Sequence, residues 1–138
     1  MMKHWLLKTD PANYSWDNLI EERKTIWRQV QNTLALKELR NIKMGDILAI
    51  YHNGDEQMLI GMAEATSEPY KDPESEDIRK YVIEIKPIKK FTQSVALWEM
   101  KNNSKLKNFD LINIPEMNVY AINEDVWHEL LVMSKERV

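Results

Sequence analysis

The stretch ILAIYHNGDEQMLIGMAEA, residues 47–65, decides the fold. Two apolar runs, residues 47–52 and 58–65, flank Asn53-Gly54-Asp55, and Asn-Gly is the strongest short-range signal for a β-hairpin. Both runs alternate little between polar and apolar residues, which is typical of strands covered on both faces, as in a closed or nearly closed barrel. Gly61 inside the second run predicts a β-bulge or a close approach of another segment.

Upstream of the hairpin, short elements are predicted. Residues 5–7 form an apolar run that ends before Pro11, which favours a first strand. Ser15 is a good N-cap residue for a helix that starts at Trp16. Residues 34–42 carry apolar side chains at helical spacing and predict a second short helix.

Downstream of the hairpin, two segments carry clear patterns. Residues 81–91 alternate between apolar and polar and predict a half-exposed strand, which Pro87 limits to a sheet edge or a bulge. Residues 123–133 predict the best helix, because Asn123 caps it and an apolar stripe follows. The remaining segments are predicted as a polar loop (67–77), a short helix (94–100), a polar linker (101–108) and a last strand (118–122).

Length and composition favour one globular domain over residues 1–138. The chain is 43% hydrophobic and 30% charged, and a core of this size needs no disulfide or metal for stability. Without cysteine, a cysteine nucleophile and a thiolate metal site are excluded, and the three histidines are scattered, so we expect no metal. No window approaches a membrane span or a signal peptide, and we expect a cytoplasmic monomer.

Motifs for several enzyme classes are missing. Three glycines cannot build a glycine-rich phosphate loop, which argues against nucleotide hydrolysis and dinucleotide redox chemistry. Ser15, His52 and Asp72 offer the residue types of a nucleophilic triad, but most chains of this size contain such a triple by chance. The sequence therefore favours a binding module without a cofactor over an enzyme.

The charges are unevenly distributed. Nineteen Lys and Arg against 22 Asp and Glu give a net charge of −3, which argues against a protein that coats nucleic acid through bulk electrostatics. Residues 23–43 nevertheless carry six bases against one acid, residues 80–107 carry seven against two, and the acidic residues 64–79 lie between them. The basic runs are either solvated faces or parts of a local phosphate-binding face.

The aromatic residues suit a planar ligand. Five Trp and five Tyr against two Phe provide flat faces with polar handles. Trp5 and Trp127 lie on apolar patterns and are expected in the core, whereas the pattern around Trp98 decides nothing. Trp27 lies in residues 25–32, an irregular stretch between two predicted helices, where it either walls a pocket or packs into the core.

A series of short blocks, in order along nearly the whole chain, resembles the EVE domain, a PUA-like module akin in fold to the YTH and ASCH domains. The blocks are Lys8-Thr9-Asp10-Pro11, Tyr14-Ser15, the set Trp27, Val30 and Asn32, residues 42–46, Tyr51-His52-Asn53, residues 61–65, Tyr70-Lys71-Asp72-Pro73 and residues 122–127. The resemblance implies an α+β fold: a PUA-like small β-barrel with short helices packed around it. Gln29, Gln31 and Leu34-Ala35-Leu36 stand where the family usually has Gly, Arg and Gln-Ala-Arg, which removes two arginines.

The resemblance also implies a function. It points to a non-enzymatic reader of a modified base in DNA or RNA, with the base held at the barrel mouth. We expect Trp27 to stack on the base, Val30 to contact an alkyl group, Asn32 and Thr9 to bond the base edge, and Lys8 to contact a phosphate. Further candidate ligand-binding residues at this rim are Tyr51, His52, Asn53 and Asp72.

A second hypothesis is a small-molecule binder or minor hydrolase on the same barrel. The net negative charge and the missing arginines motivate it. The two hypotheses predict different ligands for one cavity beside Trp27.

Overall fold

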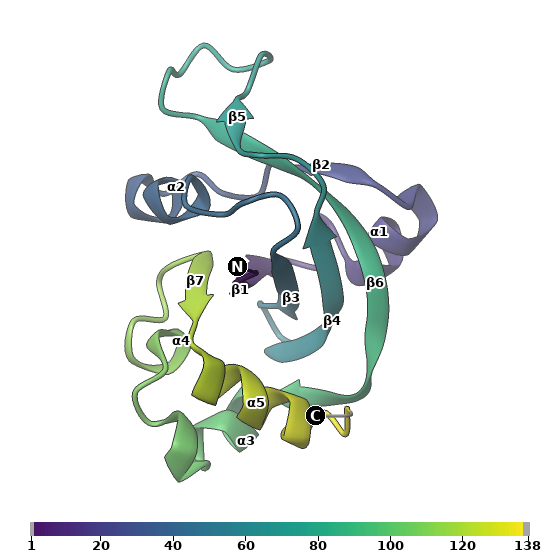
Figure 1. The fold of residues 1–138 in the computed structure, drawn as a ribbon, viewed down its shortest axis with the longest axis vertical. Coiled ribbons are helices and arrows are strands. Elements are labelled where there is room, and N and C mark those ends of the chain that lie inside the picture. Colours follow the sequence, from purple (N-terminus) through teal and green to yellow (C-terminus); the bar gives the residue numbers. More distant parts are fainter. Residues whose placement is uncertain (1, 137–138) are drawn as a thin grey trace.

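The computed structural model describes residues 2–136 and is built on a mixed seven-stranded sheet. The strand order is β2-β6-β4-β3-β1-β7, and β5 pairs with β6. Figure 1 shows the sheet curled into a half-barrel. The strands are β1 (His4–Thr9), β2 (Thr25–Trp27), β3 (Ile47–His52), β4 (Met58–Ala65), β5 (Tyr70–Lys71), β6 (Tyr81–Ala96) and β7 (Val119–Ile122).

Two groups of helices cover the sheet. Side chains of α1 and α2 pack into one hydrophobic cluster, here the α1–α2 cluster, and those of α3, η1, α4 and α5 pack into a second, the α3–α5 cluster. In Figure 1, α3, α4 and α5 gather at the end of the molecule away from α2 and β5. The helices are α1 (Trp16–Glu22), α2 (Thr33–Leu39), α3 (Leu97–Lys101), the 3₁₀-helix η1 (Ser104–Leu106), α4 (Asp110–Asn113) and α5 (Glu124–Met133), and none of them is long and apolar enough to cross a membrane.

The predicted hairpin is confirmed. β3 and β4 pair antiparallel, and Gly54 adopts a positive φ of 69° in the connecting turn. The predicted close approach at Gly61 is also confirmed, because a Cβ atom there would lie 2.8 Å from the ring of Trp16 and 2.9 Å from the Lys89 carbonyl oxygen. The register of the pair shifts between Ile50 and Tyr51, opposite this glycine.

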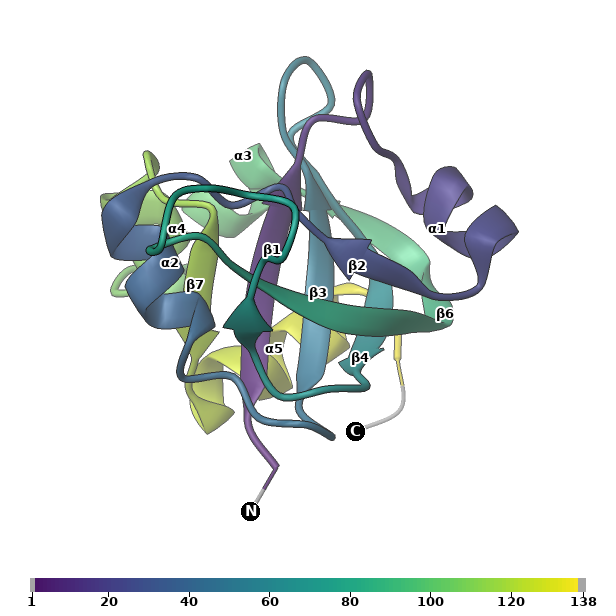
Figure 2. The same cartoon turned by 90° about the horizontal axis from the view of Figure 1, so that it is seen from above.

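β1 pairs parallel with β3, and this pairing orders the ends of both strands. Lys8 lies opposite Tyr51 and Thr9 opposite His52. A parallel pair needs a long crossover, and here α1, β2 and α2 supply it. Seen from above, the segment after β1 and the turn of the β3–β4 hairpin project at the same end of the molecule (Figure 2), where the backbone N–H of Asn53 donates to the Thr9 carbonyl oxygen over 3.0 Å.

Several local predictions need correction. Residues 25–27 form strand β2 and are not irregular, because they pair with Ile83–Ile85 of β6. Residues 94–96 are not helical but continue β6, because Val95 and Ala96 pair with the start of β4. Pro87 lies at a register shift, as a bulge requires, although β6 has partners on both sides. The predicted loop contains β5, and the predicted linker contains η1.

The α+β class is confirmed, and the barrel is only partly formed. Among residues 2–136 the path of paired strands ends at β2 and β7, so the sheet is an open half-barrel. The α2 helix contacts β7 and β6 beside this opening. A helix that covers a free strand edge protects it from pairing with other chains.

Gly61→Ala tests the close contact between the sheet and α1. The added methyl group would displace the Trp16 ring or the β6 backbone, and we expect it to lower the free energy of unfolding by about 1–3 kcal/mol. Urea unfolding followed by circular dichroism measures the change. The exposed Gln93→Ala in β6 should stay within about 0.5 kcal/mol of wild type. Equal stability of both variants would show that the contact is not tight.

Candidate functional site

The predicted site residues lie on two faces of the sheet. Successive side chains of a strand point to opposite faces, so Lys8 and Thr9 diverge. Lys8 and its neighbour Tyr51 face the α3–α5 cluster, whereas Thr9 and its neighbour His52 face the α1–α2 cluster. Trp27 and Val30 belong to the α1–α2 cluster. The nine predicted residues therefore do not converge on one rim.

Trp27 is buried. Its residue exposure is 1%, so the expectation that the ring lines a hollow open to solvent is not met. The ring packs edge-on against Tyr14, with centroids 5.8 Å apart and planes at 88°. Among the described residues, its indole nitrogen Nε1 is buried without a hydrogen-bond acceptor. An unpaired buried donor costs about 1–3 kcal/mol, so this N–H group is an unusual feature of the core.

Tyr14 covers Trp27 from the segment between β1 and α1. The Thr9 hydroxyl donates to the Tyr14 carbonyl oxygen over 2.7 Å, and the Tyr14 hydroxyl donates to the Glu22 carboxylate. Burial raises the pKa of Tyr14 to about 12, and the hydrogen bond to Glu22 adds to the shift. The Tyr14 side chain is half-buried and packs against the α1–α2 cluster.

His52 ties α1 to the hairpin. Its Nε2 atom accepts a hydrogen bond from the Trp16 backbone N–H over 3.0 Å, and Nδ1 lies 3.0 Å from the Glu56 carboxylate. An Nε2 that accepts cannot carry a proton, so the proton lies on Nδ1 and is donated to Glu56. Both ring nitrogens are occupied by these contacts. The Ser15 hydroxyl caps α1 by accepting from the Asn18 N–H, so the triple of Ser15, His52 and Asp72 is not assembled.

Asp72 is buried and binds the segment that follows Trp27. Its carboxylate accepts from Arg28 Nε over 3.3 Å and from the Glu74 N–H over 2.9 Å. These two donors, the Glu74 N–H first, hold the pKa of Asp72 below its ordinary value. The Lys80 ammonium donates to the carbonyl oxygens of Arg28, over 3.1 Å, and Val30, over 2.5 Å. The β5–β6 connection therefore holds residues 28–30 from one side.

Asn32 and Asn53 have structural roles of their own. The Asn32 side-chain oxygen caps α2 by accepting from the N–H groups of Leu34 and Ala35 at 2.8 and 3.3 Å. The Asn32 side chain is exposed, and its NH₂ group takes no part in the cap. Asn53 begins the hairpin turn.

Lys8 is not placed for a phosphate. It is 7% exposed, and its ammonium donates to the Pro115 carbonyl oxygen over 2.5 Å and to the Tyr120 hydroxyl over 3.2 Å. The ammonium also lies 5.9 Å from the centre of the Tyr51 ring. Burial lowers the pKa of Lys8. These contacts hold the segment between α4 and β7, and a phosphate in solution does not reach this ammonium.

Bases of both basic runs pair with acids. Lys24 binds Glu84 at 3.0 Å, and several other partners come from the acidic residues 64–79. The further pairs are Arg28 with Asp72 and Glu74, Lys86 with Glu64, Lys89 with Glu136 and Lys105 with Glu129. Five of the thirteen bases in the two runs are thus paired with acids among the described residues.

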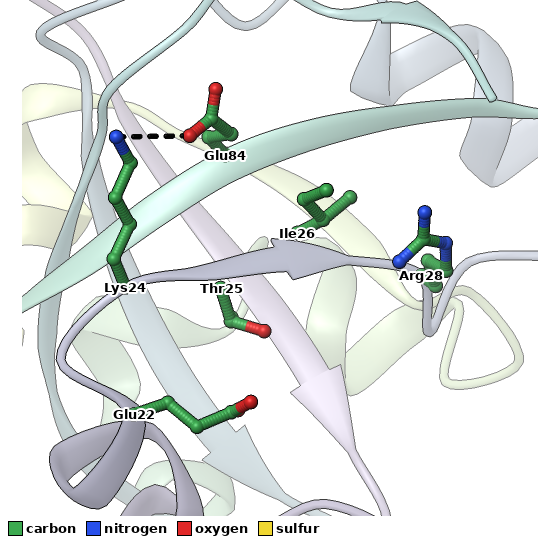
Figure 3. Close-up of a pocket in the computed structure, with 6 residues that line it drawn as sticks. All are labelled: Glu22, Lys24, Thr25, Ile26, Arg28 and Glu84. Carbon is green, nitrogen blue, oxygen red and sulfur yellow. Dashed lines mark ion pairs between the residues drawn. The ribbon is translucent and has the colours of Figure 1, made fainter. Parts of the chain in front are cut away.

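An open groove of about 470 Å³ runs along β2, the edge strand that carries Trp27. Figure 3 shows its charged side chains, with Lys24 reaching Glu84 across β6 and Arg28 at the far end. Glu22, Thr25 and Ile26 complete the lining, and Trp27 is not part of it. The groove therefore borders the Trp27 site without opening into it.

Two residues at the site were not singled out from sequence. Tyr14 lay within a recognised block, and its position between a strand and a helix N-cap was its only signal. Lys80 had no sequence signal for this role, because its partners are backbone carbonyl groups that lie 52 and 50 positions away along the chain.

One protein-family model matches nearly the whole chain. The model of the EVE domain matches residues 3–133. The chain belongs to the EVE family. Comparison with curated proteins found no match.

Solved structures share the fold of this EVE chain. Protein Atu2648 from Agrobacterium tumefaciens is 25% identical with a TM-score of 0.91, covering 97% of this chain and 94% of that one. Human THYN1, crystallised with 5-methylcytosine-containing DNA, is 20% identical with a TM-score of 0.87, covering 99% of each chain. The ASCH protein from Zymomonas mobilis is 10% identical with a TM-score of 0.60, covering 95% of each chain.

Lys8→Ala tests the structural role of the buried ammonium. The change leaves the Pro115 carbonyl without its donor, and we expect the free energy of unfolding to fall by about 1–3 kcal/mol. Lys90→Ala, at an exposed position of β6, is the control and should change stability by less than about 0.5 kcal/mol. A Lys8→Ala protein as stable as this control in urea unfolding would contradict the role.

The raised pKa of Tyr51 leads us to expect a loss of stability at alkaline pH. Burial raises its pKa to about 12, above the ordinary value of 10. The folded state therefore retains a proton that the unfolded chain releases, so this contribution is present below pH 10 and is lost as the pH rises towards 12. We expect Tyr51→Phe to flatten the decline in unfolding free energy between pH 10 and 12. An unchanged slope in urea titrations would count against it.

Proposed function

We propose that this chain is a non-enzymatic module that binds nucleic acid carrying a modified base and holds that base against Trp27. The observation that carries the proposal is the buried indole N–H of Trp27, which has no acceptor among the described residues. A relative of the same fold, human THYN1, was crystallised with 5-methylcytosine-containing DNA. We therefore take 5-methylcytosine in DNA as the first candidate ligand.

The unpaired donor suits the edge of a pyrimidine. Cytosine carries a ring nitrogen and an exocyclic oxygen that accept hydrogen bonds, and proteins that extrude a base read this edge while aromatic or apolar side chains contact its face. An acceptor opposite Trp27 Nε1 would remove the cost of the unpaired N–H. Val30, which belongs to the α1–α2 cluster together with Trp27, offers an apolar contact for a methyl group.

Access to Trp27 requires Tyr14 to move. The Tyr14 ring packs edge-on against the indole and is held by the hydrogen bond from its hydroxyl to Glu22, while Thr9 holds only the Tyr14 backbone carbonyl. A net hydrogen bond is worth about 0.5–1.5 kcal/mol, so this cover can open at a cost that base binding can offset. The ring that leaves and the base that enters are both flat, which preserves contact with the indole.

Backbone phosphates contribute little in this proposal. Each phosphate that an unpaired Lys or Arg neutralises adds about 0.9 to the slope of log affinity against log salt concentration. Because Lys24, Arg28 and Lys86 already pair with acids, we expect a shallower slope than all the bases of the two runs would give, and a larger share of the affinity from the modified nucleobase.

The test compares two DNA duplexes that differ only in one 5-methylcytosine, using fluorescence anisotropy at several salt concentrations. Wild type should prefer the methylated duplex. Trp27→Phe keeps an aromatic face but lacks the N–H, so we expect it to lose most of this preference.

Trp98→Phe is the matched control, because Trp98 is 67% exposed on α3, and it should bind as wild type. Equal wild-type affinity for both duplexes would refute recognition of this base. An unchanged preference in Trp27→Phe would refute the role of the indole N–H.

A small apolar molecule is the second candidate ligand, and a separate groove favours it. A groove of about 330 Å³ lies between α2 and β7, with Leu34, Ile114, Met117 and Tyr120 in its lining. This volume lies at the lower end of the range for small-molecule sites. Native mass spectrometry of the purified protein tests this candidate, and a ligand-free mass would count against it.

A further inference from the structure

The Lys80 side chain makes an unusual contact between two distant segments. It lies immediately before β6, and its ammonium donates to two carbonyl oxygens of the segment between β2 and α2, those of Arg28 and Val30. An ammonium that joins two carbonyl oxygens fixes the orientation of both peptide groups. Desolvation lowers the pKa of Lys80, whose side chain is half-buried.

Asp72 holds the same segment from the other end of the β5–β6 connection. Its carboxylate binds the Arg28 side chain, and its backbone N–H donates to the Lys80 carbonyl oxygen over 2.9 Å. The two residues are thus joined to one another and to residues 28–30. Among the described residues, the Lys71 ammonium, by contrast, makes no hydrogen bond with residues 28–30 and donates only within the β5–β6 connection, to the carbonyl oxygens of Asp72 and Ser75 at 2.7 Å each.

The held segment is short and otherwise lacks regular structure. Trp27 ends β2, Asn32 caps α2, and the residues between them belong to no helix or strand. The backbone of such a segment loses about 1–2 kcal/mol of conformational entropy per residue when it is fixed. Without contacts from outside, Trp27 and Val30 would not keep a defined spacing.

We propose that Lys80 is a positioning residue of the Trp27 site, whose ammonium fixes the Arg28–Val30 backbone and so sets where Trp27 and Val30 meet a ligand. The inference rests on the proposed function. Lys80 touches only protein carbonyl groups in this role and makes no contact with the ligand or its phosphates. It acts by preorganisation, which improves affinity because less order has to be created on binding.

The experiment uses Lys80→Met, which keeps the length of the side chain and removes the ammonium, and Lys80→Arg, which restores donors and charge. Lys71→Met is the matched control, because its ammonium contacts only its own loop. Three measurements are made on each folded variant: affinity for methylated duplex DNA across a salt series, the NMR signal of the Trp27 indole N–H, and hydrogen exchange of the amides of residues 28–30.

We expect Lys80→Met to bind methylated DNA about tenfold more weakly, with the salt slope of wild type. The Trp27 indole signal should shift and exchange at residues 28–30 should accelerate. Lys80→Arg should recover most of the affinity, and Lys71→Met should match wild type in all three measurements.

Two results would overturn the inference. Affinity, indole signal and exchange that all stay unchanged in Lys80→Met would show that the ammonium positions nothing. A salt slope smaller by about one, with unchanged exchange, would make Lys80 a direct phosphate contact.

The exchange and NMR measurements need no ligand, so they separate this inference from the proposed function. If wild type fails to prefer methylated DNA, the proposed function fails. In that case, hydrogen exchange at residues 28–30 alone decides whether Lys80 positions the segment. If Lys80→Met does not fold, Lys80→Leu, which also lacks a donor, replaces it, and exchange at residues 28–30 equal to wild type would refute the inference.

Discussion

The pairing of β2 with β6 is the constraint on which the candidate site depends. Three residues of β2 lie opposite Ile83–Ile85, and this register turns the Trp27 ring into the α1–α2 cluster. A three-residue edge strand is too short to hold itself in register. Its neighbours supply the rest: the Lys80 ammonium and the Asp72 carboxylate beyond its end, and Tyr14 across the indole.

Burial of Trp27 and a binding role for it are compatible if the closed form is one state of an equilibrium. A ligand that binds only the open form has its affinity reduced by the fraction of molecules that are open. That reduction applies equally to every base. Discrimination therefore has to come from contacts made after Tyr14 moves, at the Trp27 N–H and beside Val30, and the closed form protects this donor from competing ligands.

Local sequence signals predicted the elements whose stabilising contacts are close in sequence. The hairpin followed from Asn53-Gly54, and α5 from its Asn123 cap. β2 and the parallel pairing of β1 with β3 were missed, because their partners are far away along the chain. All the site residues were predicted to lie on one rim. Strand alternation alone, however, places the side chains of Lys8 and Thr9 on different faces of the sheet. The Lys80 contact was beyond sequence reasoning, because backbone carbonyl groups carry no residue signature.

The distribution of charge constrains the proposed binding of nucleic acid. Acids among residues 64–79 pair with bases of both basic runs, as Glu64 with Lys86 and Asp72 with Arg28 show. Each pair is worth little to stability at the surface, but it removes a base from phosphate binding. A protein with net charge −3, in which five of the thirteen bases of the two runs are paired with acids, gains less from the DNA backbone than one whose bases are all free. In the proposed function, affinity then comes mainly from the nucleobase, which favours a preorganised site, and the contacts of Asp72 and Lys80 with the segment after Trp27 fit this requirement.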